Sequence, residues 1–138
     1  KSPNLSILKN ISSKIPSSKL PVKTIIHSLA TDKWSFELVK RKPLYPDHVI
    51  FCGKDVLILD PENIKLENLK SYDYVLIPKY GVIILKENSE ILEVMLEMQA
   101  VIFSKLKMGT KTFCLSEFQC NELLNWEAEK YRQKIITN

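Results

Sequence analysis

The side chains best suited to chemistry in this 138-residue sequence are two histidines and three cysteines, namely His27, His48, Cys52, Cys114 and Cys120. They show neither CxxC nor HxxxH spacing, whereas a structural zinc site needs four such ligands close together. A catalytic Ser or Cys would need an oriented histidine beside it, and no GxSxG motif occurs. We therefore expect no metal, no cofactor and free thiols, as in an intracellular protein of the nucleus or cytoplasm.

Carboxylates are the remaining candidates for catalysis. Asp60 and Glu62 form the densest acidic pair near a predicted strand end, where paired acids can hold Mg²⁺. A turn in which Asp60 accepts a hydrogen bond from its own following backbone explains the same residues. The three glycines are isolated, which excludes a P-loop or Rossmann nucleotide site. We expect a protein that is not an enzyme and has no small-molecule substrate.

Positive charge is concentrated in the first part of the chain. Residues 1–54 contain ten Lys or Arg and three acids, although the net charge of the whole chain is only +4. Lys40, Arg41 and Lys42 follow Trp34 and Phe36, a combination that would join phosphate contacts to base stacking. Binding of DNA or RNA is therefore one hypothesis. A solvated, lysine-rich surface explains the same charges.

The elements that must position these residues begin after a Ser- and Lys-rich segment. Residues 1–20 are expected to form a flexible arm outside the core, and residues 21–138 a single domain. An amphipathic stretch within the arm leaves open that it docks on the domain. Apolar residues at i, i+3, i+4 and i+7 predict a short helix over 21–31. Alternating apolar residues over 34–39 then predict a strand.

The middle of the chain is rich in β-branched residues. Two apolar runs, 49–52 and 55–59, flank Gly53 and predict one hairpin, and the runs 74–77 and 82–85 predict a second hairpin. A further short strand is predicted over 112–115. Because these runs are continuously apolar rather than alternating, both faces of the sheet should be covered. We expect an α/β or α+β fold with a mixed sheet of about five strands.

Two long helices are predicted in the C-terminal half. The first, over 90–107, has acids in its first turn and lysines in its last, and its apolar residues cover more than one stripe. The second, over about 117–135, begins with Ser116 and Gln119, which form a capping-box pattern. A helix with so wide an apolar surface either lies at the centre of the core or buries a second side against a partner. The expected partner-binding residues are Met95, Met98, Ile102, Phe103 and Trp126.

One segment resembles a known family. Asp73, the apolar run that follows it, Pro78 and Lys86 are similar to the strand pair of the XPF-type nuclease domain. Where that family has its catalytic Glu-Arg-Lys segment, this chain has Ile83 and Ile84, and the family's usual tandem helix-hairpin-helix module is not present. The resemblance thus implies a catalytically inactive nuclease fold that binds DNA or RNA. It also implies no Mg²⁺- or Mn²⁺-dependent cleavage, with no effect of Asp73→Asn.

The leading hypothesis from the sequence is a non-enzymatic scaffold module that binds another protein chain. The apolar content of 45% supports a packed core. No run approaches the roughly 18 apolar residues of a membrane span. Because the chain begins at Lys1, we expect a piece of a larger protein.

Overall fold

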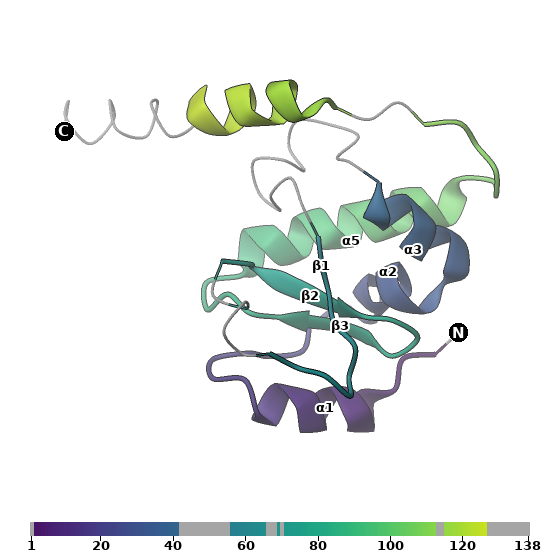
Figure 1. The fold of residues 1–138 in the computed structure, drawn as a ribbon. Helices are drawn as coiled ribbons and strands as arrows, with labels where there is room; N and C mark the ends of the chain where they lie inside the picture. Colours follow the sequence, from purple (N-terminus) through teal and green to yellow (C-terminus); the bar gives the residue numbers. More distant parts are fainter. Residues whose placement is uncertain (1, 42–55, 66–68, 70, 113–114, 127–138) are drawn as a thin grey trace.

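A computed structural model describes residues 2–41, 56–65, 69, 71–112 and 115–126. Its helices are α1 (Leu5–Ser13), the 3₁₀ helix η1 (Thr24–His27), α2 (Ser28–Thr31), α3 (Lys33–Lys40) and α5 (Glu90–Lys105). Its strands are β1 (Leu57–Ile58), β2 (Tyr74–Ile77) and β3 (Gly81–Ile84). The sheet lies between α1 on one side and the remaining named helices on the other (Figure 1).

The sheet is mixed, in the order β1-β2-β3. Strands β2 and β3 form an antiparallel hairpin in which Val75 pairs with Ile83, and β1 runs parallel to β2. The hairpin turn contains Lys79 at a φ of 72°, and the Tyr80 N–H donates to the Ile77 carbonyl at 3.0 Å. The predicted second hairpin is confirmed by this pairing.

The expected number of strands was wrong, because the described residues form a sheet of three strands and not about five. Thr112 and Leu115 lie outside any strand. Part of the other predicted hairpin, including Gly53, lies outside the described residues. A run of apolar residues indicates that a segment is buried, but it does not show that the segment pairs with another strand. Counting such runs therefore overestimates the number of strands in a sheet. The mixed α and β content agrees with the α+β alternative of the predicted fold class.

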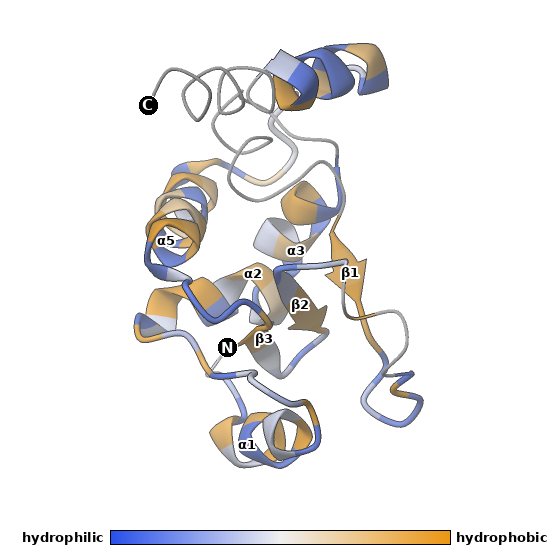
Figure 2. Ribbon diagram, turned by 90° about the vertical axis from the view of Figure 1, so that its left-hand side faces the viewer, coloured by the Kyte–Doolittle hydropathy of each residue, from blue (hydrophilic) through white to orange (hydrophobic). Residues whose placement is uncertain are grey.

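The two faces of the sheet carry separate apolar clusters, as the continuously apolar strands predicted. Successive side chains of a strand point to opposite faces. The cluster under α2, α3 and α5 includes Tyr74, Leu76, Val82 and Ile84. The cluster under α1 includes Val75, Ile77 and Ile83. Figure 2 shows the same three layers from the side, with α1 on the opposite side of the sheet from α5.

The N-terminal segment differs from the arm predicted for residues 1–20. Asn4 caps α1 by accepting the Ile7 N–H at 3.1 Å. Leu8 and Ile11 on α1 are buried against the sheet, together with the sequentially nearby Ile15. The spacing of these three residues gives the helix one apolar side that covers the second face of the sheet. This segment therefore contributes to the core.

Residues 33–40 form α3, so the strand predicted over 34–39 was wrong. Asp32 caps the helix by accepting the Ser35 N–H at 2.8 Å, and Leu38 and Val39 are buried. Trp34, Phe36 and Leu38 recur at every second position, which is the pattern of a strand, so the buried side of this helix was not recognised. The helix predicted over 21–31 is shorter and divided, with η1 preceding α2.

The last described helix occupies residues 117–126. Its predicted capping box is confirmed, because the Ser116 N–H donates to Gln119 Oε1 at 2.8 Å and the Gln119 N–H donates to Ser116 Oγ at 3.1 Å. Cys120 is a buried free thiol. This helix lies beyond α5, away from the sheet (Figures 1 and 2).

Candidate functional site

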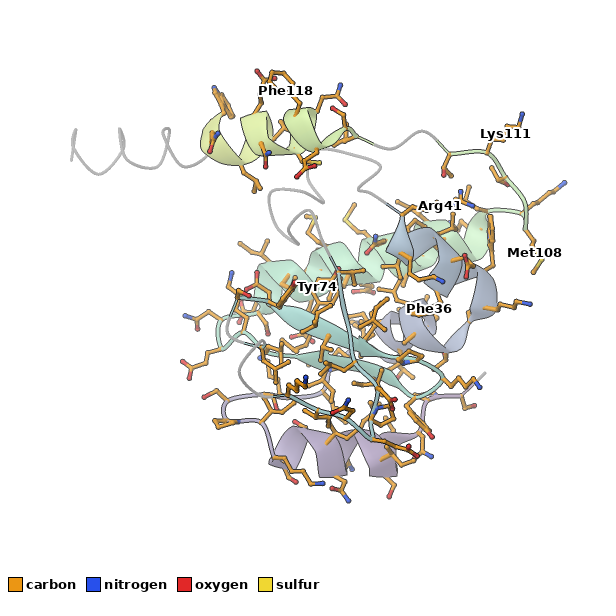
Figure 3. The ribbon with its side chains drawn as sticks, viewed as in Figure 1. Phe36, Arg41, Tyr74, Met108, Lys111 and Phe118 are labelled. Atoms are coloured by element: carbon orange, nitrogen blue, oxygen red, sulfur yellow. The ribbon has the colours of Figure 1, made fainter. Side chains whose placement is uncertain are left out.

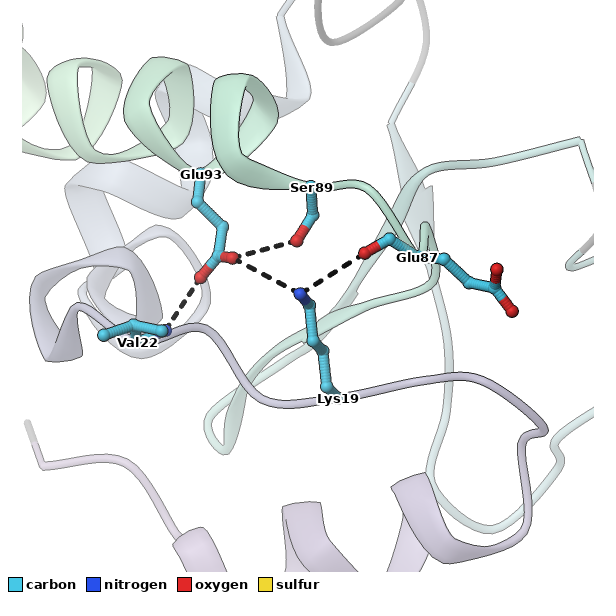
Figure 4. Close-up of polar contacts among 5 residues, drawn as sticks. All are labelled: Lys19, Val22, Glu87, Ser89 and Glu93. Atoms are coloured by element: carbon cyan, nitrogen blue, oxygen red, sulfur yellow. Dashed lines mark hydrogen bonds and ion pairs between the residues drawn. The ribbon is translucent and has the colours of Figure 1, made fainter.

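Helix α5 is held at its first turn by a polar network (Figure 4). Ser89 Oγ donates to Glu93 Oε2 at 2.9 Å, and Glu93 Oε1 accepts the Val22 N–H at 2.8 Å. Lys19 Nζ lies 3.9 Å from Glu93 Oε2 and donates to the Glu87 carbonyl at 3.5 Å. These contacts join the start of α5 to the segment before η1, so they help to set which side of the helix faces the sheet.

The inner side of α5 belongs to the core. Leu92, Leu96, Ala100 and Phe103 are buried in the cluster that covers the sheet. Their spacing of four, four and three residues puts them on one side of the helix. Gln99 is also buried, and its Oε1 has no hydrogen-bond partner among the described residues. This inner side accounts for only part of the apolar residues of the helix.

The outer side of α5 carries a second row of apolar residues. Ile91, Val94, Met98 and Ile102 are 59%, 52%, 48% and 41% exposed, respectively. They recur at three, four and four residues, so they form one continuous row along the helix. We call these four residues the outer stripe. Covering such half-exposed side chains would contribute about 1 kcal/mol each, on the basis of apolar area.

The five predicted partner-binding residues do not share one surface. Met98 and Ile102 belong to the outer stripe, whereas Phe103 is 1% exposed and Met95 packs against the core. Trp126 is 57% exposed and lies on the separate 117–126 helix. Counting apolar residues indicated an unusually apolar helix without separating its two sides.

Ile91 and Val94 were not among the predicted partner-binding residues. Both are more exposed than Met98 and belong to the same row. The signal that could have found them was present in the sequence, because positions 91, 94, 98 and 102 follow helical spacing opposite the buried row. The prediction instead favoured methionine residues, because their flexible side chains suit a contact surface.

An open hollow of about 670 Å³ lies beside the 117–126 helix. The Trp126 side chain contributes to its wall, together with polar and apolar neighbours. The described lining residues are Leu115, Gln119, Glu122, Leu123, Asn125 and Trp126. Phe118 is 70% exposed on the same helix and points away from the rest of the molecule (Figure 3).

The two described residues of the predicted nucleic-acid site make contacts within the chain. Lys40 Nζ lies 2.7 Å from Glu37 Oε1 and 4.8 Å from the centre of the Phe36 ring. The Lys40 ammonium group lowers the pKa of the Glu37 carboxyl, which is fully ionised at neutral pH. The charge of Lys40 is therefore partly balanced.

Arg41 joins α3 to the segment that follows α5. Its Nη1 donates to Thr112 Oγ1 at 2.6 Å, and its guanidinium group lies 5.2 Å from the centre of the Trp34 ring. Lys42, the third predicted contact, lies outside the described residues. The aromatic side chains next to these cations are also half-buried against the core rather than free for base stacking.

The candidate catalytic residues have structural roles where they are described. His27 is buried, and its Nδ1 accepts the Val82 N–H at 3.0 Å. Asp60 Oδ1 accepts the Glu62 N–H at 3.0 Å, as the turn interpretation predicted. In the part of the chain that the structure describes, no three His, Cys, Asp or Glu side chains group together as a metal site. His48, Cys52 and Cys114 lie outside the described residues.

Among the residues that resemble the XPF-type domain, Asp73 and Lys86 lie at the open end of the β2–β3 hairpin, and Pro78 lies at its turn. The Asp73 carbonyl accepts the Leu85 N–H at 2.8 Å, and Lys86 is exposed just beyond β3. Ile83 and Ile84 are fully buried on opposite faces of the sheet. The resemblance would place the charged catalytic residues of that family at these two positions.

The fold and the outer stripe define a three-layer α+β protein with an apolar helix surface. Comparisons with protein families, with curated proteins and with solved structures find no match. The XPF-type resemblance therefore stays a prediction from the quoted residues. Among the described helices, none has the length and apolar character needed to cross a membrane.

Proposed function

We propose that this protein is a non-enzymatic interaction module and that the outer stripe of α5 binds another protein. The proposal depends on a single observation, the row formed by Ile91, Val94, Met98 and Ile102 opposite the buried side of the same helix. Isolated exposed apolar residues are normal on protein surfaces, whereas a contiguous row is typical of interaction sites. The partner would present an apolar side chain surface of similar length.

The border of the outer stripe favours a partner with some basic character. Glu90 is exposed and Glu97 is half-exposed, and both lie on the helix beside the stripe. Lys105 is the only basic residue within α5. Charges of opposite sign at the rim of an apolar contact mainly set orientation and association rate. A helix with an apolar side and flanking Lys or Arg meets both requirements.

Photo-crosslinking from a single position tests this proposal. A photoreactive amino acid replaces Met98 in one variant and Ser104 in the control, since both residues are exposed on α5 but only Met98 belongs to the stripe. We expect an intermolecular crosslink from position 98 that is at least tenfold stronger than from position 104. Adding Val94→Glu should abolish it, because a charge in the row opposes apolar burial.

Two results would contradict the proposal. Equal crosslinking from positions 98 and 104 would indicate nonspecific contact. A crosslink from position 98 to another segment of the same chain would show that the stripe is covered intramolecularly. A crosslinked pair of identical chains would support an interaction module whose partner is a second copy.

Binding of DNA or RNA is the alternative function, and the contacts of Lys40 and Arg41 make it the weaker proposal. Its test is a titration with single- and double-stranded oligonucleotides at low salt. Joint neutralisation of Lys40, Arg41 and Lys42 should weaken any binding and reduce its salt dependence in proportion to the number of phosphates that these side chains neutralise. No measurable affinity, or affinity unchanged by these substitutions, would contradict this alternative.

A further inference from the structure

The backbone groups on the outer edge of β3 have two different kinds of hydrogen-bond partner. Strand β3 is at the end of the order β1-β2-β3, so its outward-facing backbone groups need partners from elsewhere. Ile84 exchanges two backbone hydrogen bonds with Lys19, of 2.9 Å and 2.8 Å. The Val82 N–H instead donates to Nδ1 of His27 at 3.0 Å. The imidazole thus occupies the position that a carbonyl of a neighbouring strand would occupy.

The imidazole of His27 fits tightly at this edge. The residue is 2% exposed. A β-carbon at Gly81 would lie only 2.6 Å from His27 Nδ1 and 2.6 Å from Leu8 Cδ1. Glycine at position 81 therefore leaves the space in which the ring lies beside the β3 backbone. It also permits the φ of +150° found there.

The hydrogen bond requires the neutral form of His27. A ring nitrogen accepts a hydrogen bond only when it carries no proton, so the hydrogen-bond network assigns the proton to Nε2. Protonation of Nδ1 would direct two N–H groups at each other and would place a charge among apolar side chains. Burial accordingly lowers the pKa of His27 from its ordinary value.

Few charged groups oppose or assist this titration. Helix α1 contributes Lys9, the hairpin contributes Lys79, and neither η1 nor α2 contains another charged residue. Lys9 and Lys79 are both exposed. The charged residues of α5 are Glu90, Glu93, Glu97 and Lys105. Within the described segments, none of these groups forms an ion pair or hydrogen bond with His27.

We propose that His27 is an acid-sensitive latch that closes the edge of β3 at neutral pH and releases it when the imidazole is protonated. Release would free the Val82 N–H and separate η1 from β3. Ile84 would keep its two hydrogen bonds to Lys19, so release would expose only the part of the edge at Val82. The latch is closed above the ordinary histidine pKa of about 6.5 and weakens as the pH falls below it.

Amide hydrogen exchange at Val82 tests the latch. Between pH 7.5 and pH 5, after correction for intrinsic exchange, we expect its protection to fall by up to about tenfold per pH unit below pH 6.5. The amide of Leu96 in α5 should retain its protection over the same range. The variant His27→Asn supplies Oδ1 as an acceptor that does not titrate, so Val82 protection should become independent of pH. The matched control His48→Asn should behave as the unmodified protein does.

A second measurement needs no substitution at His27. Long-range ¹H–¹⁵N NMR of the unmodified chain should show Nδ1 without a proton at pH 7.5, and should show its protonation together with the loss of Val82 protection. A proton on Nδ1 at pH 7.5 would overturn the proposal. So would constant Val82 protection in the unmodified chain, equal loss at Val82 and Leu96, or the same pH dependence in His27→Asn.

Discussion

The two helices that cover opposite faces of the sheet differ in their outer surfaces. Helix α1 buries Leu8 and Ile11, and its exposed side is mostly polar. Helix α5 buries a longer row and exposes the four apolar residues of the outer stripe. A polar outer surface is stable in contact with water, whereas covering an apolar outer surface lowers the free energy. This difference supports the proposal that a partner binds on the side of α5 rather than on the side of α1.

The largest effect on stability is expected at Gly81, where η1 and α1 both contact the sheet. Gly81→Ala places a β-carbon within 2.6 Å of both His27 in η1 and Leu8 in α1. Overpacking and an unfavourable φ together should lower the free energy of unfolding by about 4 kcal/mol, measured by urea denaturation. Gly109→Ala is the control, since Gly109 also has a positive φ but has open space around it. It should cost about 1 kcal/mol, and equal costs would contradict the packing argument.

The next prediction compares the two apolar clusters directly. Leu8 and Leu96 are both fully buried, one under α1 and the other under α5. Leu8→Ala and Leu96→Ala should each lower the free energy of unfolding by about 3 kcal/mol, because each leaves a cavity. Urea denaturation measures both. A cost below about 1 kcal/mol for Leu8→Ala alone would show that α1 contributes little to the core, as the predicted arm implied.

Acid should weaken the contact between η1 and β3. Because burial lowers the pKa of His27, the unfolded chain binds a proton more readily than the folded chain. The resulting stability is present above about pH 6.5 and is lost as the pH falls toward the lowered pKa, at a rate of at most about 1.4 kcal/mol per pH unit. Urea midpoints at pH 7.5, 6.5 and 5.5 measure this slope. A slope unchanged in His27→Asn would assign it to other groups.

The smallest effect on stability is expected at the outer stripe. Met98→Glu should change the free energy of unfolding by no more than about 0.5 kcal/mol, because the side chain is exposed and packs little in the folded chain. Phe103→Ala, five residues later on the buried side, should cost about 3 kcal/mol. Thermal denaturation of both variants measures the difference. A large cost for Met98→Glu would indicate that the stripe is part of the folded core.

The reliable predictions came from signals that lie close together in the sequence. The β2–β3 hairpin follows from two apolar runs separated by a turn, and its strands pair as expected. The start of α5 follows from the acids of its first turn, and the capping box at Ser116 forms both of its hydrogen bonds. Such signals act within about four residues, so no distant contact is needed to form them.

The wrong predictions concern segments in which local patterns conflict or distant partners decide. Residues 34–39 alternate like a strand, yet the Asp32 cap and burial of Leu38 and Val39 under α5 favour a helix. The Ser- and Lys-rich N-terminal segment is too polar to predict a core helix, yet its few apolar residues cover the free face of the sheet. Tertiary burial overrides weak local preference in both cases.

The sequence by itself determined the mixed α and β content, the hairpin, the unusual apolar content of α5 and the need for two covered sheet faces. Only the tertiary structure decided which apolar residues of α5 remain exposed and which segment covers the second face. It also brought His27 to Val82, a contact between residues 55 positions apart. Helical and turn signals are local, whereas burial depends on which distant segments meet. The entropic cost of closing a long loop grows only slowly with its length, so loop length does not specify which distant segment becomes the partner.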